Sequence, residues 1–556
     1  MDQFFERLGQ RLVSDGRYND AERPYTQVIK MRKRVLGEEH PHTLTSVSNL
    51  AWVLQYQGKY KEAEMMNRQA LDGREKVLGE EHPDTLQSLS RLAVVLLCQG
   101  KYEEAEVMNR RALDGREKVL GEEHPDTLRS FDNLASALQR QGKYEEAEAM
   151  NRRALDGREK VLGEEHPDTL TSVSSLAMVL LDQGKYEGAE AMNRRALDAC
   201  EKVLGNEHPD TMECVNNMAL VLQCQGKYEE AEAMNLRALN GSAKVLGEEH
   251  PDHLSSLSNL ASVLGAQGKY EEAEIMNRQA LNGRERVLGE EHPDTLTSLN
   301  NLALVLYHQG KYEEAGAMIR RALDGSAKVL GMEHPDTLKS LGNLARVLQD
   351  QGKYKEAEAV NRWALGVREV LGEEHPATLT NVSDLAWVLY YRGRYEEAEA
   401  MNRRALEGRE KVLGEEHPDT LTSVSSLAIV LQDQGKYEEA EAMIRRALDG
   451  CEKALGNDHP ETLTNVHYFV CLLHEQKRYE AASELYQRAF SGYRMILGPS
   501  HHTTIACDDH YYSMRQEMDA AGALVKQKSR SWNAFRFDDV RLLGEPDGPA
   551  DMGYQL

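Results

Sequence analysis

Apolar residues recur along the chain at spacings of three and four, in a pattern that returns about every 42 residues. In the copy at 84–125 the first apolar series is Leu86, Leu89, Leu92, Ala93 and Leu96. The second series of the same copy is Ala105, Met108, Ala112, Leu113, Val119 and Leu120. Spacings of three and four place such residues on one face of a helix. Each copy is therefore predicted to be a pair of amphipathic helices.

Residues that start and stop helices lie at the edges of both apolar series. Pro83 suits a first helical turn, and Asp84 and Thr85 bring a negative charge and an acceptor near the exposed N–H groups. Gly100, in the run Gln-Gly-Lys-Tyr, is predicted to end the first helix with a turn. Gly121 is predicted to end the second helix before the next copy begins.

The dipeptide His-Pro marks the joint between copies. Its histidines are His40, His82, His124, His166, His208, His250, His292, His334, His375, His417 and His459. The spacing is 42 residues throughout, except that His375 comes one residue early. A single helix pair cannot bury its apolar face, so the copies are expected to stack into a solenoid. Small residues such as Ala93, Ala105 and Ala112 are expected where the helices meet.

The repeated motif resembles a known family. The pattern Asn-Leu-Ala-x-x-Leu-x-x-Gln-Gly-Lys-Tyr-x-Glu-Ala, as at 301–315, resembles the tetratricopeptide repeat. The 42-residue period and the joint Leu-Gly-x-x-His-Pro-Asp-Thr-Leu resemble the repeats of kinesin light chains and of related arrays on multidomain nucleotide-binding receptors. The resemblance covers roughly residues 2–525. It implies an all-α fold, a right-handed superhelical solenoid of about 12 helix-turn-helix repeats with a degenerate C-terminal cap.

The two ends of the array depart from the repeat pattern. Copy twelve carries Lys477 where other copies have the turn glycine, and helical spacing is lost from about Lys526. Terminal repeats close a stack against water, so atypical copies are interpreted as caps. The predicted organisation is an N-terminal capping repeat at 1–40, tandem repeats at 41–500, a degenerate C-terminal capping repeat at 501–525 and a flexible tail at 526–556.

Composition and charge mainly exclude classes of protein. Sixty-seven basic against 92 acidic residues give a net charge of −25, which argues against nucleic acid as a partner. No apolar run approaches the ~18 residues of a membrane span, and the opening residues carry charge where a signal peptide is apolar. Seven scattered cysteines without a CxxC motif fit reduced thiols. The expectation is a cytoplasmic protein with no nucleic-acid or membrane partner; the oligomeric state stays open.

No catalytic residue, cofactor site or metal site is predicted. The run Glu-Glu-His, as at 122–124, could suggest a metal site, but its return at most joints favours a structural role. The chain has no His-Glu-x-x-His, and Gly-Lys-Tyr is not the Gly-Lys-Ser/Thr of a phosphate-binding loop. The protein is therefore predicted not to be an enzyme and to need no cofactor.

The resemblance also implies where a partner would bind. In tetratricopeptide arrays the first helix of each pair lines a concave groove. Here the groove positions are the fourth, seventh, eighth, eleventh, fourteenth and fifteenth residues after each joint proline. These positions vary between copies while the frame stays constant, which favours a binding surface over random drift. The predicted peptide-binding residues are Asn49, Trp52, Tyr56, Arg91, Asn133, Arg140, Asn217, Asn259, Asn301, Tyr307, Asn343, Arg346, Trp387, Tyr390 and Tyr391.

Two features of these positions favour a peptide partner. The eighth residue is asparagine in six copies, and an amide that donates and accepts can pair with the backbone of an extended peptide. Hydrogen bonding to a neighbouring helix is the alternative role. Trp387, Tyr390 and Tyr391 form the densest aromatic cluster, which is typical of a contact surface. Packing between helices is the alternative for these aromatic side chains.

The function predicted from these features is a non-catalytic scaffold for protein–protein interaction. Its partners would be other proteins or peptides, bound as extended segments or as surfaces in the concave groove. Two alternatives stay open. The array could be the ligand-sensing region of a larger nucleotide-binding signalling receptor, because the sequence opens inside a copy. It could also be a cargo adaptor of the kinesin light chain type, although the heptad coiled coil expected before such repeats is missing.

Overall fold

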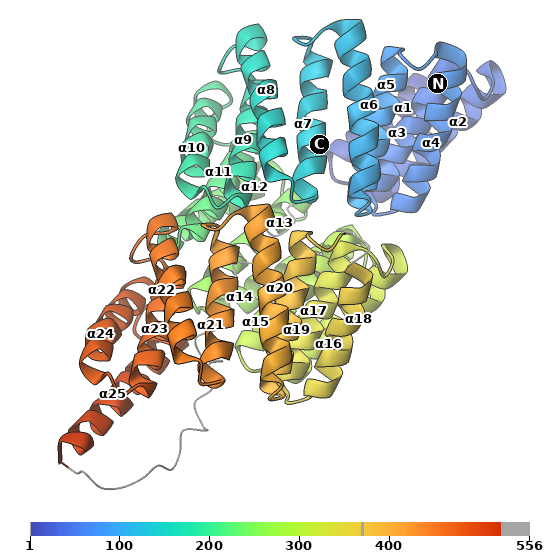
Figure 1. Ribbon diagram of the computed structural model, residues 1–556. Helices are drawn as coiled ribbons and strands as arrows, with labels where there is room; N and C mark the ends of the chain where they lie inside the picture. Colours follow the sequence, from blue (N-terminus) through green and yellow to red (C-terminus); the bar gives the residue numbers. More distant parts are fainter. Residues whose placement is uncertain (1, 369–371, 524–556) are drawn as a thin grey trace.

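The computed structural model describes residues 2–368 and 372–523, and these residues form helices and no strand. Helices with odd labels are the first helix of each copy, and helices with even labels are the second. Copies stack side by side, and Figure 1 shows two layers, α1–α12 above and α13–α25 below. The predicted all-α solenoid is confirmed. The predicted tail at 526–556 lies outside the described residues.

The first helices begin at the joint proline in every copy from the second to the twelfth. They are α1 (Asp2–Ser14), α3 (Pro41–Tyr56), α5 (Pro83–Cys98), α7 (Pro125–Arg140), α9 (Pro167–Asp182), α11 (Pro209–Cys224), α13 (Pro251–Ala266), α15 (Pro293–His308), α17 (Pro335–Asp350), α19 (Pro376–Tyr391), α21 (Pro418–Asp433), α23 (Pro460–Glu475) and α25 (His502–Ala523).

The second helices begin at the tyrosine of the Gly-Lys-Tyr turn or its equivalent. They are α2 (Tyr18–Leu36), α4 (Tyr60–Leu78), α6 (Tyr102–Leu120), α8 (Tyr144–Leu162), α10 (Tyr186–Val203), α12 (Tyr228–Val245), α14 (Tyr270–Val287), α16 (Tyr312–Val329), α18 (Tyr354–Arg368), α20 (Tyr395–Leu413), α22 (Tyr437–Ala454) and α24 (Tyr479–Ile496).

The joint histidine is the N-cap of each first helix that follows it. Nδ1 of His82 accepts a hydrogen bond from the backbone N–H of Asp84 at 3.1 Å. Thr85 instead donates its hydroxyl to the carbonyl of Gly79, at 2.8 Å, and so fastens the loop before the helix. Asp84 brings the expected negative charge to the first helical turn, but the N-cap is His82 rather than Asp84 or Thr85. An imidazole nitrogen takes the place of the usual side-chain oxygen.

Small residues bring the helices of a pair together, as predicted. Ala93 on α5 and Ala105 and Ala112 on α6 are fully buried, and Leu92 and Leu96 beside them are fully buried too. Alanine at a helix crossing lets the two backbones approach closely, and the leucines fill the space between copies.

A buried arginine on many second helices ties neighbouring copies together. Arg74 on α4 is 2% exposed and donates to Thr45 of α3 at 2.9 Å and to Ser88 of α5 at 2.7 Å. It also donates to the carbonyl of Asp84 at 3.1 Å. Equivalent bonds to the next first helix are made by Arg116, Arg158, Arg284 and Arg409. This role of the arginine was not predicted from the sequence.

Successive turns of the superhelix contact each other along a line that we call the seam. At the seam, a joint packs on the Gly-Lys-Tyr turn of a copy that lies 235 or 236 residues earlier. Nε2 of His292 lies 2.9 Å from the carbonyl oxygen of Tyr56. The same bond, at 2.9–3.0 Å, joins His334 to Cys98, His375 to Arg140, His417 to Asp182 and His459 to Cys224. The early position of His375 changes the offset from 236 to 235.

Both nitrogens of a seam histidine are used. Nδ1 of His292 accepts from the backbone N–H of Asp294 at 3.1 Å, so the ring proton is on Nε2, which donates to Tyr56. The imidazole thus caps its own helix and binds the preceding superhelical turn.

The turn glycine is required for this close approach. A Cβ on Gly58 would lie 2.4 Å from Cδ of Pro293, and the residue has φ of +70°. Both the positive φ and the contact exclude ordinary side chains. The remaining seam contacts pair Gly16 with Pro251, Gly100 with Pro335, Gly142 with Pro376, Gly184 with Pro418, Gly226 with Pro460 and Gly268 with His501.

The seam is expected to weaken in acid. Burial lowers the pKa of His459 to about 4, against the opposing hydrogen bond to the Cys224 carbonyl. This folded-state pKa lies below the unfolded value of about 6.5, so stability is lost as the pH falls below 6.5. By pH 5 the loss is about 2 kcal/mol. Between pH 7.5 and 5, the midpoint of urea unfolding should therefore fall further in the wild type than in a His459→Asn variant.

His208→Asn is the matched control for this measurement. His208 makes the same N-cap bond, at 3.2 Å, but its side chain is 41% exposed and makes no seam contact with a described residue. Its pH dependence of unfolding should equal that of the wild type. Equal pH dependence in wild type and His459→Asn would contradict the assignment of a neutral, buried imidazole at the seam.

Candidate functional site

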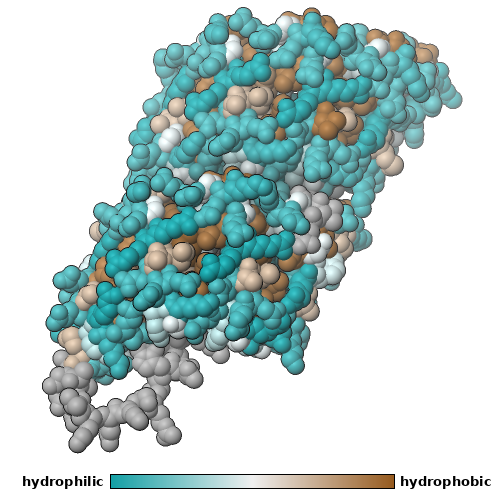
Figure 2. All heavy atoms as spheres, viewed as in Figure 1, coloured by the Kyte–Doolittle hydropathy of each residue, from teal (hydrophilic) through white to brown (hydrophobic). Residues whose placement is uncertain are grey.

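The outer surface consists of solvated charge pairs. Figure 2 shows hydrophilic side chains over most of one face, with smaller apolar groups between them. Arg110 lies 2.7 Å from Glu106, and Lys143 of the next copy lies 2.9 Å from it. Burial raises the pKa of Glu106, but the hydrogen bonds from Lys143, Arg110 and Gln141 outweigh it and lower the pKa to about 2. Glu106 thus pairs within its own helix and also links two copies.

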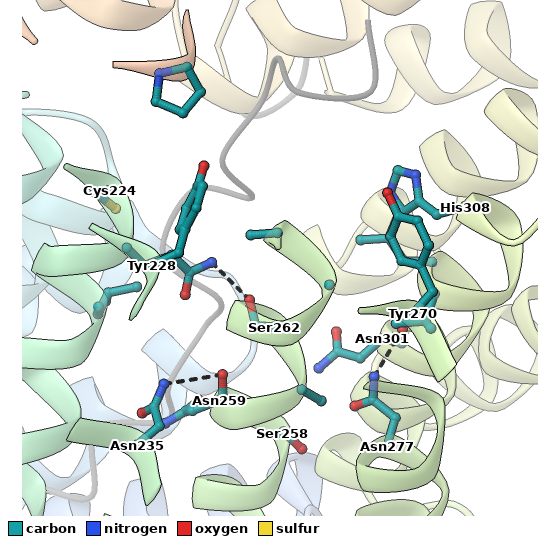
Figure 3. A pocket seen from close by; sticks show the side chains of 18 of the residues that line it. Cys224, Tyr228, Asn235, Ser258, Asn259, Ser262, Tyr270, Asn277, Asn301 and His308 are labelled. Carbon is teal, nitrogen blue, oxygen red and sulfur yellow. Dashed lines mark hydrogen bonds between the residues drawn. The ribbon is translucent and has the colours of Figure 1, made fainter. Parts of the chain in front are cut away.

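A pocket lies over the first helices α11, α13 and α15 (Figure 3). Its lining is rich in amides and hydroxyls. From the first helices come Asn216, Gln223, Ser258, Asn259, Ser262 and Asn301. From the second helices come Tyr228, Asn235, Tyr270 and Asn277. The rim includes His459, Pro460 and Glu461 of the next superhelical turn, so the seam forms one wall of the pocket.

The asparagines of the second helices have a structural role. Asn235 donates to the carbonyl of Asn259 at 3.4 Å, and Asn277 donates to the carbonyl of Asn301 at 3.5 Å. Asn109, which is 1% exposed, makes the same bond to the carbonyl of Asn133, at 2.9 Å. Each bond joins a second helix to the next first helix. The recurrence of asparagine in the second helix was the available signal, and the sequence analysis did not use it.

The asparagines at the eighth position do not form one continuous row. Asn259 and Asn301 are partly exposed on neighbouring helices, and both line the pocket. Asn133 and Asn217 are only 6% and 2% exposed. Asn343 on α17 is partly exposed but does not line the pocket. The row therefore offers two adjacent amides in the pocket rather than a uniform series along the array.

The three predicted arginines are spread over different copies. Nη1 of Arg91 donates to the side chain of Asn49 at 3.1 Å, and burial lowers the pKa of Arg91. Arg140 ends α7, and its carbonyl is a seam acceptor for His375. Arg346 is partly buried on α17. These side chains therefore do not form a single basic patch.

The densest aromatic cluster is packed between helices. Trp387 and Tyr390 are 8% and 9% exposed, and their rings meet edge-on with centroids 5.5 Å apart. The Tyr390 hydroxyl donates to Asp433 of α21, and burial raises the pKa of Tyr390. Tyr391 is partly buried and stacks on Tyr354, with centroids 6.0 Å apart. Trp387 and Tyr390 therefore have the alternative role, which is packing between helices.

The other predicted aromatic residues also have neighbours. Tyr56 stacks on Tyr18 with ring centroids 4.8 Å apart, and Trp52 meets the Tyr56 ring edge-on at 5.1 Å. Tyr307 is 8% exposed, and its hydroxyl donates to Asp350 of α17. Ligand contact by these side chains stays a prediction.

Several carboxyl groups of the first helices hold their protons unusually tightly. Loss of solvation raises the pKa of Asp182 to about 6, although Gln139 donates a hydrogen bond to it at 2.6 Å. Loss of solvation and the neighbouring Asp210 raise the pKa of Glu213 to about 7. Burial therefore favours the neutral form of both carboxyl groups compared with exposed ones.

One cluster of the described residues has spacing that could hold a metal ion. Ligand atoms of His467 and Cys471 on α23 and of His510 on α25 lie within 4.8 Å of one another. The two imidazoles already form a hydrogen bond, with Nε2 of His467 and Nδ1 of His510 3.0 Å apart. Burial raises the pKa of the Cys471 thiol to about 12, whereas metals bind thiolate. Packing of the C-terminal cap accounts for this cluster.

Family comparisons agree with the repeat geometry. A model described as tetratricopeptide repeat matches overlapping segments from residue 68 to residue 495, and a second model with the same description matches 5–42 and 43–84. The chain belongs to the tetratricopeptide repeat family. Tetratricopeptide repeat proteins are typically scaffolds for protein interaction, and the repeats of this chain support such a scaffold.

Solved tetratricopeptide structures give a weaker likeness. A putative kinesin light chain from Podosopora anserina with nearly identical TPR-like repeats is 29% identical and covers 37% of this chain and 97% of its own, at a TM-score of 0.33. BtubC (BKLC) from P. vanneervenii is 22% identical and covers 42% of this chain and 91% of its own, at a TM-score of 0.35. TM-scores this low carry no argument about shape. No curated protein matches the chain. Among the described residues, no helix is both long and apolar enough to span a membrane.

Proposed function

We propose that the pocket over α11, α13 and α15 binds an extended segment of a partner protein. The observation that carries the proposal is the pair Asn259 and Asn301, which occupy the same repeat position on neighbouring helices and line one pocket. A side-chain amide has both a donor and an acceptor, as a peptide unit does. Two neighbouring amides can therefore pair with the backbone of an extended segment. The second-helix asparagines support this row by bonding to its carbonyls.

The rest of the pocket lining suits a peptide that carries both apolar and charged side chains. Tyr228 offers a ring and a hydroxyl group for side chains of the segment. Lys339 and Glu461 place one charge of each sign at the edges, so the pocket has no strong preference for an acidic or a basic peptide. Trp387 and Tyr390 of α19 are not part of this proposal because they are buried, and Tyr391 does not line the pocket.

Substitution of both pocket asparagines tests the proposal. A peptide selected from a random library on the intact protein, and binding with micromolar affinity, is the probe. Asn259→Ala combined with Asn301→Ala should weaken its binding about thirty-fold, since two hydrogen bonds of about 1 kcal/mol each are lost. Isothermal titration calorimetry measures the change in Kd.

Asn49→Ala combined with Asn343→Ala is the matched control. These two asparagines occupy the same repeat position but lie outside the pocket. The control should bind the peptide with the wild-type Kd. If both double variants bind as the wild type does, the pocket is not the peptide site.

A further inference from the structure

The seam uses only part of the docking elements that the chain carries. The joints from His250 to His501 pack on earlier turns. The joints of His40, His82, His124, His166 and His208 meet no turn among the described residues. The side chains of His124 and His166 are each 40% exposed, whereas those of His292 and His334 are 6% and 7% exposed. One end of the array thus presents a row of unoccupied joints.

The other end presents the matching row of unoccupied turns. A Cβ added to Gly310, Gly352, Gly393 or Gly435 would meet no described atom within 4 Å. These glycines have φ between +71° and +75°, and the docked glycines Gly58 and Gly100 have φ of +70° and +71°. The unoccupied turns therefore already have the backbone conformation that receives a joint.

The two rows are complementary because they are copies of one interface. Three of the four unoccupied turns have the sequence Gln-Gly-Lys-Tyr of the docked turns, and the fourth, at 392–395, has arginine in place of glutamine and of lysine. The unoccupied joints share their His-Pro with the docked joints. An unoccupied turn can therefore make the same contacts with a joint that Gly58 makes with Pro293.

We infer that a second copy of this chain docks head to tail, with its unoccupied joints on the unoccupied turns of the first. The interface would continue the seam from one molecule to the next. The two rows lie at opposite ends of the array and are related by the advance of a superhelix, so the contact cannot close into a ring. A contact between two different surfaces that does not close produces open filaments.

Lys477 sets the limit of the docking row. It replaces glycine in the turn of copy twelve and has φ of +61°. A side chain is tolerated there because no joint of the same chain packs on that turn. It would occupy the place of the joint proline, so docking of a second copy is confined to the four glycine turns.

Net charge makes this association depend on salt. Each chain carries a formal charge of −25, so two copies repel at low ionic strength. Salt screens this repulsion over about 10 Å at 0.1 M. Association is therefore expected to increase with salt, in contrast to binding that is driven by opposite charges.

Sedimentation velocity of the intact chain over a concentration series tests the inference. In 0.15 M salt the average mass should rise with concentration beyond the mass of a dimer. Two variants each obstruct one side of the interface. Glutamate in place of the joint proline at all five unoccupied joints, Pro41, Pro83, Pro125, Pro167 and Pro209, obstructs the joints while keeping a favourable residue in the first helical turn. Asparagine at all four unoccupied turns, Gly310, Gly352, Gly393 and Gly435, obstructs the turns with a residue that tolerates positive φ.

Each blocked variant keeps one intact row, and this gives the decisive comparison. Either variant alone should stay monomeric with the circular dichroism of the wild type. An equimolar mixture should form a 1:1 pair and nothing larger. The inference is overturned if the wild-type mass stays monomeric at all concentrations. It is also overturned if a blocked variant alone associates as the wild type does, or if the mixture stays monomeric while the wild type associates.

Discussion

Replacing the five seam histidines with asparagine is expected to lower the free energy of unfolding by about 5 kcal/mol, about 1 kcal/mol for each hydrogen bond lost. The five are His292, His334, His375, His417 and His459. Asparagine is a good N-cap, so each first helix keeps its cap while the shorter side chain no longer reaches the preceding superhelical turn. The helix pairs should stay folded and the two layers of Figure 1 should separate.

The chain supplies a matched control for this variant. His40, His82, His124, His166 and His208 make the same N-cap bond but no seam contact with a described residue. Asparagine at these five positions should change the free energy of unfolding little. Urea unfolding followed by circular dichroism, with a separate measurement of hydrodynamic radius, compares the two variants. Equal losses of stability in both would mean that capping, not the seam, accounts for the histidines.

The second large effect is expected at the buried ion pair of copy four. Asp132 on α7 lies 2.7 Å from Nη2 of Arg158 on α8, and both side chains are 7% exposed. Ser172 of α9 donates to the same carboxylate at 3.0 Å. Asp132→Ala leaves the buried Arg158 guanidinium without a side-chain acceptor at this position. The expected loss is about 3–5 kcal/mol in the free energy of unfolding.

The Asp132→Ser variant removes the carboxylate charge but keeps a hydrogen-bond acceptor for Arg158. Copy three has Ser90 at this position, and Arg116 donates to its hydroxyl at 3.1 Å. Burial raises the pKa of Asp132 to about 6 despite the nearby Arg158, so the ion pair gives little net stabilisation. The serine variant should therefore unfold at nearly the wild-type urea concentration. A loss as large as that of the alanine variant would show that the carboxylate itself stabilises the copy.

Local structure could be predicted from the sequence because it depends on residues close together in the chain. The apolar spacing, the joint proline and Gly100 located α5 and α6 nearly to the residue. Stacking followed from the exposed apolar face of a single pair. The N-cap role of His82 was not predicted because serine, threonine, aspartate and asparagine are commoner capping residues than histidine.

The seam could not be predicted because it depends on how many copies complete one superhelical turn. The number of copies in one superhelical turn is set by the small rotation between neighbouring copies. The 42-residue sequence pattern does not show how large this rotation is. Burial of Trp387 and Tyr390 is also not visible in the repeat pattern. The repeat position of Trp387 holds different residues in different copies, as a binding position would. The Trp387 side chain nevertheless packs against Tyr390 where neighbouring helices meet. The pocket with Asn259 and Asn301 arises where the groove passes close to the seam.

The distance between two residues on opposite sides of the seam tests the central claim most directly. Lys59 and Asp294 are exposed and directly follow the contacting residues Gly58 and Pro293. Spin labels on unnatural amino acids at these positions avoid the seven native cysteines. If the superhelical turns dock, pulsed electron resonance on dilute protein will give one narrow short-distance peak, and the five seam substitutions will abolish it. A broad, long distribution in the wild type would contradict the seam and the pocket wall that it forms.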